Sequence, residues 1–133
     1  MDRYTILLVD DEKVIREGCR RAFVTEGFKV FTAANGLEAL DVLAREPIHA
    51  ILCDLKMPVM GAMGVLEEVN EHYPDVPLII ITGQGTIANA VECMRKGAYD
   101  FVTKPFRIDD VILVVKRAIS KLPPLQRFLS TSG

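Results

Sequence analysis

The chain has 133 residues, of which 50% are hydrophobic and 26% charged, and its formal net charge is −2. These values are typical of one globular domain, and they exclude a disordered, collagen-like or coiled-coil chain. The charge predicts no direct binding of nucleic acid, and no apolar run approaches the roughly 20 residues that span a membrane.

Strand-like and helix-like segments alternate through the first half of the chain. Residues 5–9 form a short apolar run that ends at Asp10-Asp11, and residues 13–26 place apolar side chains at helical spacing. Residues 28–31 predict a second strand, and Asn35 is the expected N-cap of a second helix with Leu37 on its apolar stripe. Residues 50–53 predict a third strand that ends at Asp54, and residues 62–72 predict a third helix.

The second half continues the same alternation. Residues 78–82 are the most apolar strand, and the helix that follows has Ile87, Val91 and Met94 on one stripe and Gly97 as its C-cap. A fifth strand is expected at residues 99–102 and a last helix at residues 108–121. This α/β pattern predicts a parallel sheet with helices on both faces. The Pro- and Ser-containing residues 122–133 are interpreted as a linker to a missing domain.

Chemically active side chains gather where the predicted strands end, which is where parallel sheets bind ligands. They are Asp10, Asp11, Asp54, Thr82 and Lys104. Three neighbouring carboxylates repel one another unless a cation neutralises them, and oxygen ligands suit Mg²⁺. A carboxylate beside that cation can attack phosphorus, and Lys104 and Thr82 can neutralise the phosphoryl oxygens. Asp54 stands alone and is the candidate nucleophile, whereas the adjacent Asp10 and Asp11 suggest a metal clamp.

Each of these residues also has a purely structural interpretation. Asp10-Asp11 could cap the first helix, Asp54 could begin an Asx turn, and Thr82 could be an ordinary β-branched strand residue. Lys104 could lie in a solvated turn. Their joint occurrence at one edge of a single predicted fold favours a functional site.

Over residues 4–121 the chain resembles the receiver domain of two-component response regulators. The motifs behind this resemblance are Val9-Asp10-Asp11, Asp54-Leu55-Lys56-Met57-Pro58, Ile81-Thr82-Gly83 and the stretch from Gly97 to Phe106. The resemblance implies a flavodoxin-like (βα)5 three-layer sandwich with a five-stranded parallel sheet of order 2-1-3-4-5. It also implies a receiver domain at residues 1–121 and a linker or tail at residues 122–133. The region from Gly83 to Phe106 is most similar to receivers attached to transcriptional activators.

The resemblance assigns a role to each residue of the predicted phosphorylation site. Asp54 is the phosphoacceptor, and a sensor histidine kinase or phosphotransfer protein is the donor. Asp11, Asp54 and the backbone carbonyl of Lys56 bind Mg²⁺ directly, whereas Asp10 binds it through water. Lys104 contacts the phosphoryl group.

The resemblance further implies a switch. Thr82 moves toward the phosphoryl group, Phe101 rotates inward, and the surface over the fourth helix, fifth strand and fifth helix changes. That surface controls an output domain, expected to regulate transcription, and the last two helices are a possible homodimer interface. Lys56 and Gln84 occupy positions that tune the lifetime of the phosphate in receivers. Receivers usually have glycine eight positions after the acceptor, where this chain has Ala62.

Two other classes of protein share parts of this pattern. A haloacid-dehalogenase-like phosphatase would use the same nucleophile but needs a second aspartate two positions later, where this chain has Lys56. Gly83-Gln84-Gly85 begins a dinucleotide-binding pattern, but the chain remaining after it is too short for the other nucleotide-binding strands. The three cysteines are an odd number without a Cys-x-x-Cys pair, which indicates a reducing cytoplasm.

Overall fold

A computed structural model of the chain describes residues 3–121, so the expected linker at 122–133 lies outside the described residues. The strands are β1 (Thr5–Val9), β2 (Lys29–Ala33), β3 (Ala50–Asp54), β4 (Leu78–Thr82) and β5 (Asp100–Thr103). The helices are α1 (Lys13–Thr25), α2 (Gly36–Arg45), α3 (Ala62–His72), α4 (Ile87–Arg95) and α5 (Ile108–Ser120), with a 3-10 turn, η1 (Gln84–Thr86), before α4.

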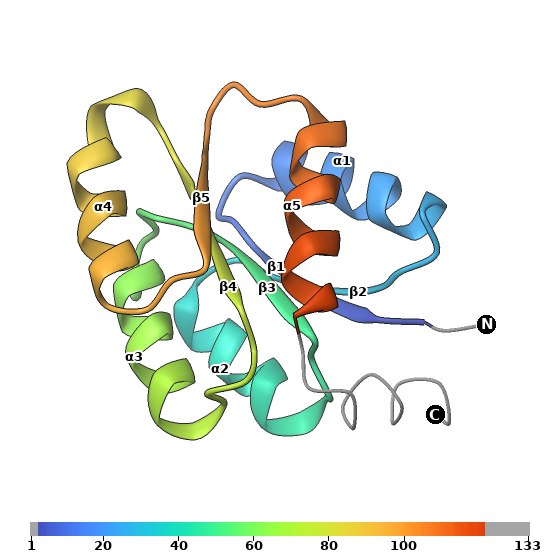
Figure 1. The fold of residues 1–133 in the computed structure, drawn as a ribbon, viewed down its shortest axis with the longest axis horizontal. Helices are drawn as coiled ribbons and strands as arrows, with labels where there is room; N and C mark the ends of the chain where they lie inside the picture. Colours follow the sequence, from blue (N-terminus) through green and yellow to red (C-terminus); the bar gives the residue numbers. More distant parts are fainter. Residues whose placement is uncertain (1–2, 122–133) are drawn as a thin grey trace.

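The five strands form one parallel sheet in the order β2-β1-β3-β4-β5. Helices α1 and α5 cover one face of this sheet, and α2, α3 and α4 cover the other (Figure 1). The predicted three-layer α/β architecture and strand order are therefore confirmed. Parallel strands end at the same edge of a sheet, so this topology brings the residues after β1, β3, β4 and β5 together.

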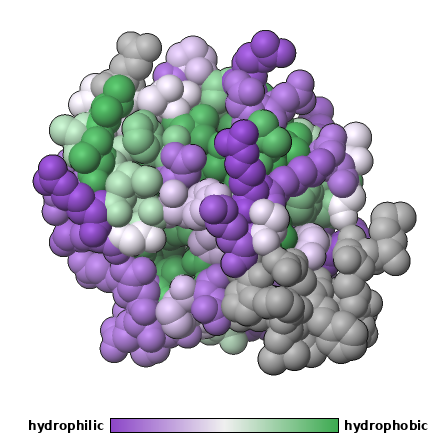
Figure 2. All heavy atoms as spheres, viewed as in Figure 1, coloured by the Kyte–Doolittle hydropathy of each residue, from purple (hydrophilic) through white to green (hydrophobic). Residues whose placement is uncertain are grey.

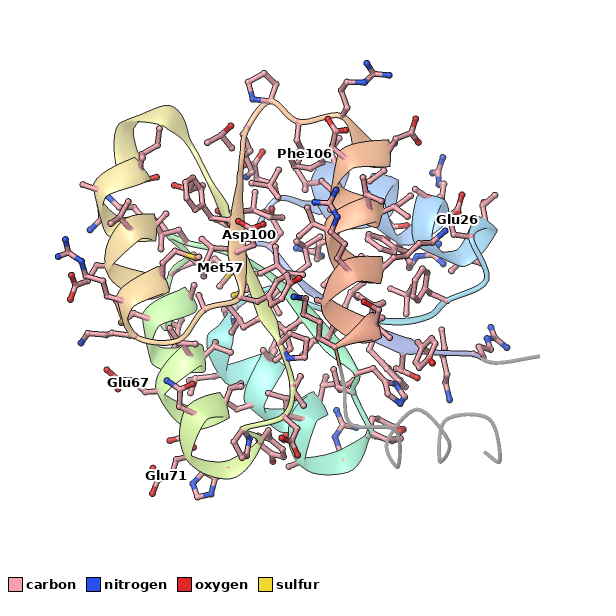
Figure 3. All side chains as sticks on the ribbon, viewed as in Figure 1. Glu26, Met57, Glu67, Glu71, Asp100 and Phe106 are labelled. Carbon is pink, nitrogen blue, oxygen red and sulfur yellow. The ribbon has the colours of Figure 1, made fainter. Side chains whose placement is uncertain are left out.

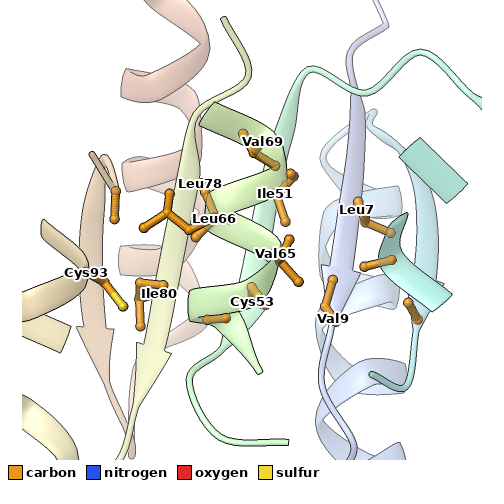
Figure 4. Packing of buried hydrophobic residues seen from close by; sticks show 14 of the residues in the cluster. Leu7, Val9, Ile51, Cys53, Val65, Leu66, Val69, Leu78, Ile80 and Cys93 are labelled. Carbon is orange, nitrogen blue, oxygen red and sulfur yellow. The ribbon is translucent and has the colours of Figure 1, made fainter. Parts of the chain in front are cut away.

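Two hydrophobic clusters hold the three layers together. Along β1, β3 and β4 successive side chains point to opposite faces, because a strand has a period of two residues. Leu7, Ile51 and Ile80 therefore pack against α2, α3 and α4 (Figure 4), whereas Ile6 and Ile79 pack against α1 and α5. All of these side chains are fully buried. Burying each one stabilises the fold by about 1.5–3 kcal/mol.

The ends of two helices match the expected capping residues. Asn35 Oδ1 accepts a hydrogen bond from the Glu38 amide at 3.0 Å, and Glu38 Oε1 accepts one from the Ala34 amide at 3.0 Å. These bonds resemble a capping box at the start of α2, except that Glu38 binds the amide of Ala34 and not that of the N-cap Asn35. After α4, Gly97 has φ +109°, and the amides of Gly97 and Ala98 donate to carbonyls in the last turn of the helix. Glycine adopts this left-handed conformation without a steric penalty.

Helix α4 is rotated relative to the apolar stripe expected from the sequence. Ala90 and Cys93 are its buried residues, whereas Ile87 and Val91 are 40% and 39% exposed. The small Ala90 and Cys93 side chains allow α4 to approach the sheet, and this orientation leaves larger apolar side chains on the surface. Apolar and polar side chains are accordingly interspersed on the surface seen in Figure 2.

Two further details differ from the sequence-based expectation: the exposure of one apolar residue in α2 and the bounds of three strands. Leu37 is 51% exposed although the sequence places it on the apolar stripe of α2. Strands β2 and β5 each begin one residue later than expected, and β3 includes Asp54. None of the helices within residues 3–121 combines the length and the apolar character needed to cross a bilayer.

Candidate functional site

Four neighbouring strands deliver the predicted site residues to one edge of the sheet. Asp10 follows β1 and is 2% exposed, while Asp54 is the last residue of β3 and is 8% exposed. Thr82 ends β4 and is fully buried. Lys104 follows β5, where its amide donates to the carbonyl of Thr82 at 2.8 Å and its bond to Pro105 is cis.

The ammonium group of Lys104 lies among three carboxylates. Its Nζ is 3.4 Å from Asp10 Oδ2, 3.4 Å from Asp54 Oδ2 and 3.1 Å from Glu12 Oε1. The oxygens of these three acids all lie within 4.8 Å of one another. One lysine cannot balance three negative charges, so the cluster retains excess negative charge at a partly buried position.

Burial, together with the charges of the cluster, perturbs the pKa values of its members. Burial, followed by the charge of Asp10, raises the pKa of Asp54 from 3.8 to about 6. Burial also raises the pKa of Asp10. Burial alone would lower the pKa of Lys104, but its hydrogen bond to Glu12 and the charges of Asp54 and Asp10 raise it above the usual value. Lys104 therefore stays charged, and the pKa of Asp54 lies at about 6.

The arrangement fits a hard divalent cation. Asp10 Oδ1 accepts a hydrogen bond from the Glu12 amide at 2.8 Å. The other oxygen, Oδ2, is buried and has no hydrogen-bond partner within residues 3–121, although Lys104 Nζ lies 3.4 Å away. A buried carboxylate oxygen without a hydrogen bond is costly unless another polar or cationic partner reaches it. Clustered oxygen ligands and uncompensated negative charge are the properties of a Mg²⁺ site.

The structure adds Glu12 to the predicted acids and places Asp11 differently. Asp11 is exposed and lies outside the cluster of Asp10, Glu12 and Asp54, although its charge contributes to the raised pKa of Asp54. The sequence signal for Glu12 was present, because it is the third acid of one uninterrupted acidic run. Glu12, and not Asp10 or Asp11, is the N-cap of α1, and its side chain makes no capping hydrogen bond, although Asp10 Oδ1 accepts from the Glu12 amide just before the helix.

The loop after Asp54 is closed by backbone hydrogen bonds. The Leu55 carbonyl accepts from the Ala62 amide at 3.1 Å, and the Met60 carbonyl accepts from the Gly36 amide at 2.9 Å. A Cβ on Gly61 would lie 2.7 Å from the Leu55 carbonyl oxygen, so this position needs glycine.

The same loop shows how the chain accommodates two unusual residues. Receivers usually have glycine at the position of Ala62, but here the Ala62 methyl group fits and is fully buried. The position at which a Cβ would clash with the Leu55 carbonyl oxygen lies one residue earlier, at Gly61. Val59 has φ +71°, a conformation that is strained for a β-branched residue, and its side chain is 74% exposed. Lys56 lies within this loop with its side chain exposed.

The hydroxyl of Thr82 and the ring of Phe101, the expected switch residues, contact groups outside the acidic cluster. Thr82 Oγ1 donates to the Gly83 carbonyl at 3.1 Å and contacts the hydroxyl of Thr86. Phe101 on β5 is partly buried against the hydrophobic cluster under α2, α3 and α4. The side chain of Gln84 lies outside the described part of the structure. Figure 3 shows Phe106 on the connection from β5 to α5 that follows Lys104.

The strand order, the acidic cluster and the lysine at the carboxyl edge of the sheet agree with the comparisons with known proteins. The chain belongs to the response regulator receiver domain family, whose model matches residues 6–116. A solved receiver domain from Clostridium thermocellum superposes with a TM-score of 0.85 at 30% identity, covering 89% of this chain and 95% of that one.

The most similar relatives include regulators named NtrX and NtrC. The chain is 41% identical over 120 residues to a response regulator named NtrX-like from Rickettsia bellii, covering 89% of this chain and 25% of that protein. It is 36% identical over 120 residues to the DNA-binding transcriptional regulator NtrC of Escherichia coli, covering 90% of this chain and 26% of that protein. The receiver domain of NtrX from Brucella abortus superposes with a TM-score of 0.81 at 35% identity, covering 87% and 98% of the two chains.

The chain therefore spans about a quarter of the length of the curated relatives that it matches. Those relatives contain further sequence, and their names describe the longer proteins.

Proposed function

We propose that this domain accepts a phosphoryl group on Asp54 from a phosphohistidine of a sensor kinase or phosphotransfer protein. In this transfer a carboxylate oxygen of Asp54 forms the new bond to phosphorus, and the bond from phosphorus to the histidine nitrogen breaks. The observation that supports Asp54 most strongly is its position within 3.4 Å of Lys104 Nζ in a cluster with excess negative charge. Family membership supports the same assignment.

Asp11, Asp54 and the backbone carbonyl of Lys56 are the proposed direct ligands of Mg²⁺, with Asp10 bound through water. The raised pKa of Asp54 explains why a cation matters, since without one this carboxylate is partly protonated near pH 6. When bound, Mg²⁺ favours the ionised nucleophile and neutralises phosphoryl oxygens.

Lys104 and Thr82 complete the proposed phosphoryl site. Lys104 is held by Glu12 at 3.1 Å on the exposed side and by Asp54 on the buried side. Releasing Glu12, which is largely exposed, lets the ammonium group contact a phosphoryl oxygen without leaving the site. The Thr82 hydroxyl supplies a hydrogen bond to a further oxygen, so the charges of the transferred group are each matched by a positive or polar partner.

The proposed output is a change in the surface formed by α4, β5 and α5. Phe101 moves inward as Thr82 turns toward Asp54, and the exposed Ile87 and Val91 of α4 lie on the surface that changes. Residues 1–121 are the proposed receiver, and residues 122–133 the proposed link to an output domain that regulates transcription, as the names of the relatives suggest. A homodimer through the last two helices and a cytoplasmic location remain predictions.

Phosphorylation with a small donor tests this proposal directly. The domain is incubated with Mg²⁺ and radiolabelled acetyl phosphate, and both the label on the protein and the release of inorganic phosphate are measured. We expect at most one alkali-labile phosphoryl group per chain in the parent. Asp54→Asn should take up no label, and omission of Mg²⁺ should abolish uptake.

The control variant is Glu67→Gln, which neutralises an exposed acid on α3 and should leave labelling unchanged. Full labelling of Asp54→Asn would show that another residue is the acceptor. Rapid continuous release of phosphate, without accumulation of labelled protein, would favour the phosphatase instead. Lys56 already argues against that enzyme, because a lysine two positions after the nucleophile cannot act as the general acid.

A further inference from the structure

The hydroxyl groups of Thr82 and Thr86 form a pair at the junction of β4 and α4. Thr82 ends β4 and is fully buried, and Thr86 is the last residue of η1. Their Oγ1 atoms contact each other. Each hydroxyl also reaches the Gly83 carbonyl oxygen, Thr82 at 3.1 Å and Thr86 at 3.0 Å.

Hydrogen counting shows that the two hydroxyls act as one unit. Three contacts link Thr82, Thr86 and the Gly83 carbonyl, but each hydroxyl has only one hydrogen to donate. At any moment one of the hydroxyls donates to the other or both donate to the carbonyl. The Thr82 hydroxyl is therefore shared between two partners, and both partners are on the side of η1.

Thr86 does not cap α4 with its side chain, although it occupies the N-cap position of that helix. It is the N-cap of α4, where a threonine hydroxyl commonly accepts a hydrogen bond from an amide of the first helical turn. The side chain of Thr86 makes no capping hydrogen bond, because its hydroxyl is turned back toward Gly83 and Thr82. The amide of Thr86 also donates to the Gly83 carbonyl at 3.1 Å, which fixes the turn that places this hydroxyl.

We propose that Thr86 is a positioning residue that holds the Thr82 hydroxyl away from the phosphoryl site until Asp54 is phosphorylated. This regulation rests on the proposed function, because a phosphoryl group on Asp54 is what draws Thr82 away. The Thr82 hydroxyl has to give up Thr86 to reach that group, so the contact opposes the switch. After Thr82 has moved, the hydroxyl of Thr86 keeps the Gly83 carbonyl as its partner.

The test removes the Thr86 hydroxyl and measures affinity for a phosphoryl analogue. Thr86→Val keeps the branched shape without the hydroxyl, and Thr86→Ser, which retains it, is the matched control. Beryllofluoride is titrated into each protein at saturating Mg²⁺ by isothermal calorimetry. We expect Thr86→Val to bind about twofold to threefold more tightly than the parent, because before the switch the two hydroxyls of the parent can place their hydrogens in up to three ways and the variant in only one. Thr86→Ser should bind with the affinity of the parent, because its hydroxyl can still hold Thr82.

Repeating the measurement in a Thr82→Ala protein distinguishes an effect of Thr86 on the Thr82 hydroxyl from a general structural effect. In Thr82→Ala no hydroxyl remains for Thr86 to hold, so adding Thr86→Val should leave the affinity unchanged. An equal gain in both backgrounds, or no gain in the parent background, would overturn the role of Thr86. Thr86→Ala, which also lacks the hydroxyl, replaces Thr86→Val if that variant unfolds.

Labelling with acetyl phosphate keeps the two proposals distinct. If the parent is labelled on Asp54 and Thr86→Val binds beryllofluoride like the parent, only the role of Thr86 is wrong. If the parent neither takes up label nor binds beryllofluoride, the proposed function fails, and the role of Thr86 fails with it.

Discussion

Replacing Asp54 by asparagine is expected to stabilise the metal-free domain. Burial and the neighbouring Asp10 raise the pKa of Asp54 from 3.8 to about 6, so the folded state resists its ionisation. A difference of this size corresponds to about 3 kcal/mol at neutral pH. The amide that replaces the carboxylate has no charge to bury but keeps an oxygen that can face Lys104. The raised pKa already includes the attraction of Lys104, so we expect a net gain of up to about 3 kcal/mol in the free energy of unfolding.

The pH dependence identifies the cause of this gain. The folded domain takes up the Asp54 proton as the pH falls through about 6, whereas the unfolded chain takes it up only near 3.8. The stability of the parent should therefore rise as the pH falls through this window, as far as Asp54 is concerned. The difference between Asp54→Asn and the parent should be largest at pH 7–8 and close to zero near pH 4.

Urea unfolding followed by far-ultraviolet circular dichroism measures this difference. The two proteins are compared in a chelator at pH 8 and pH 4, with Glu67→Gln as the control for loss of an exposed charge. Adding Mg²⁺ should stabilise the parent more than the variant, because the cation favours the ionised carboxylate. A destabilised Asp54→Asn at pH 8, or a gain that is equally large at pH 4, would refute the reasoning.

Three further predictions concern other parts of the domain. Val59→Gly should raise the free energy of unfolding by about 1 kcal/mol in urea titrations, because φ +71° is strained for valine, and a loss would contradict this. Gly61→Ala should lower the free energy of unfolding by about 1–3 kcal/mol, because its Cβ would lie 2.7 Å from a backbone oxygen. Gly18→Ala in α1 is the matched control and should raise the free energy of unfolding, because the space around Gly18 is open. Burial lowers the pKa of His49, whose Nδ1 accepts a hydrogen bond from the Thr5 amide, so the unfolded chain takes up the His49 proton at a higher pH than the folded domain. Between pH 7.5 and 5 the parent should therefore lose stability relative to His49→Gln as the pH falls below about 6.5.

The strands and the edge at which the site lies could be anticipated because several independent signals agree. Uninterrupted apolar runs predicted β1, β3 and β4, and the acids, threonine and lysine came directly after such runs or at their last residue. The strand order itself came from the resemblance to receivers, because periodicity identifies strands but does not say which ones are neighbours. The capping residues Asn35 and Gly97 were also correct, since each depends on a local rule.

What the sequence left open depends on tertiary packing. The orientation of α4 follows from how closely the small Ala90 and Cys93 allow it to approach the sheet, and this contact has no local signature. Glu12 joins the cluster because its side chain reaches Lys104, 92 positions further along the chain. The pairing of Thr82 with Thr86 depends on the tight η1 turn, which the expected helix did not include.

The two hydrogen bonds that close the loop after Asp54 set a limit on how this region can vary. One joins the Leu55 carbonyl to Ala62, and the other joins the Met60 carbonyl to Gly36 at the start of α2. The segment between these anchor points has a fixed length, and it contains the Lys56 carbonyl. Single replacements such as Ala62 can be absorbed there, but an inserted or deleted residue would shift every backbone oxygen relative to β3. Relatives of this domain are therefore expected to differ in the composition of this segment while keeping its number of residues.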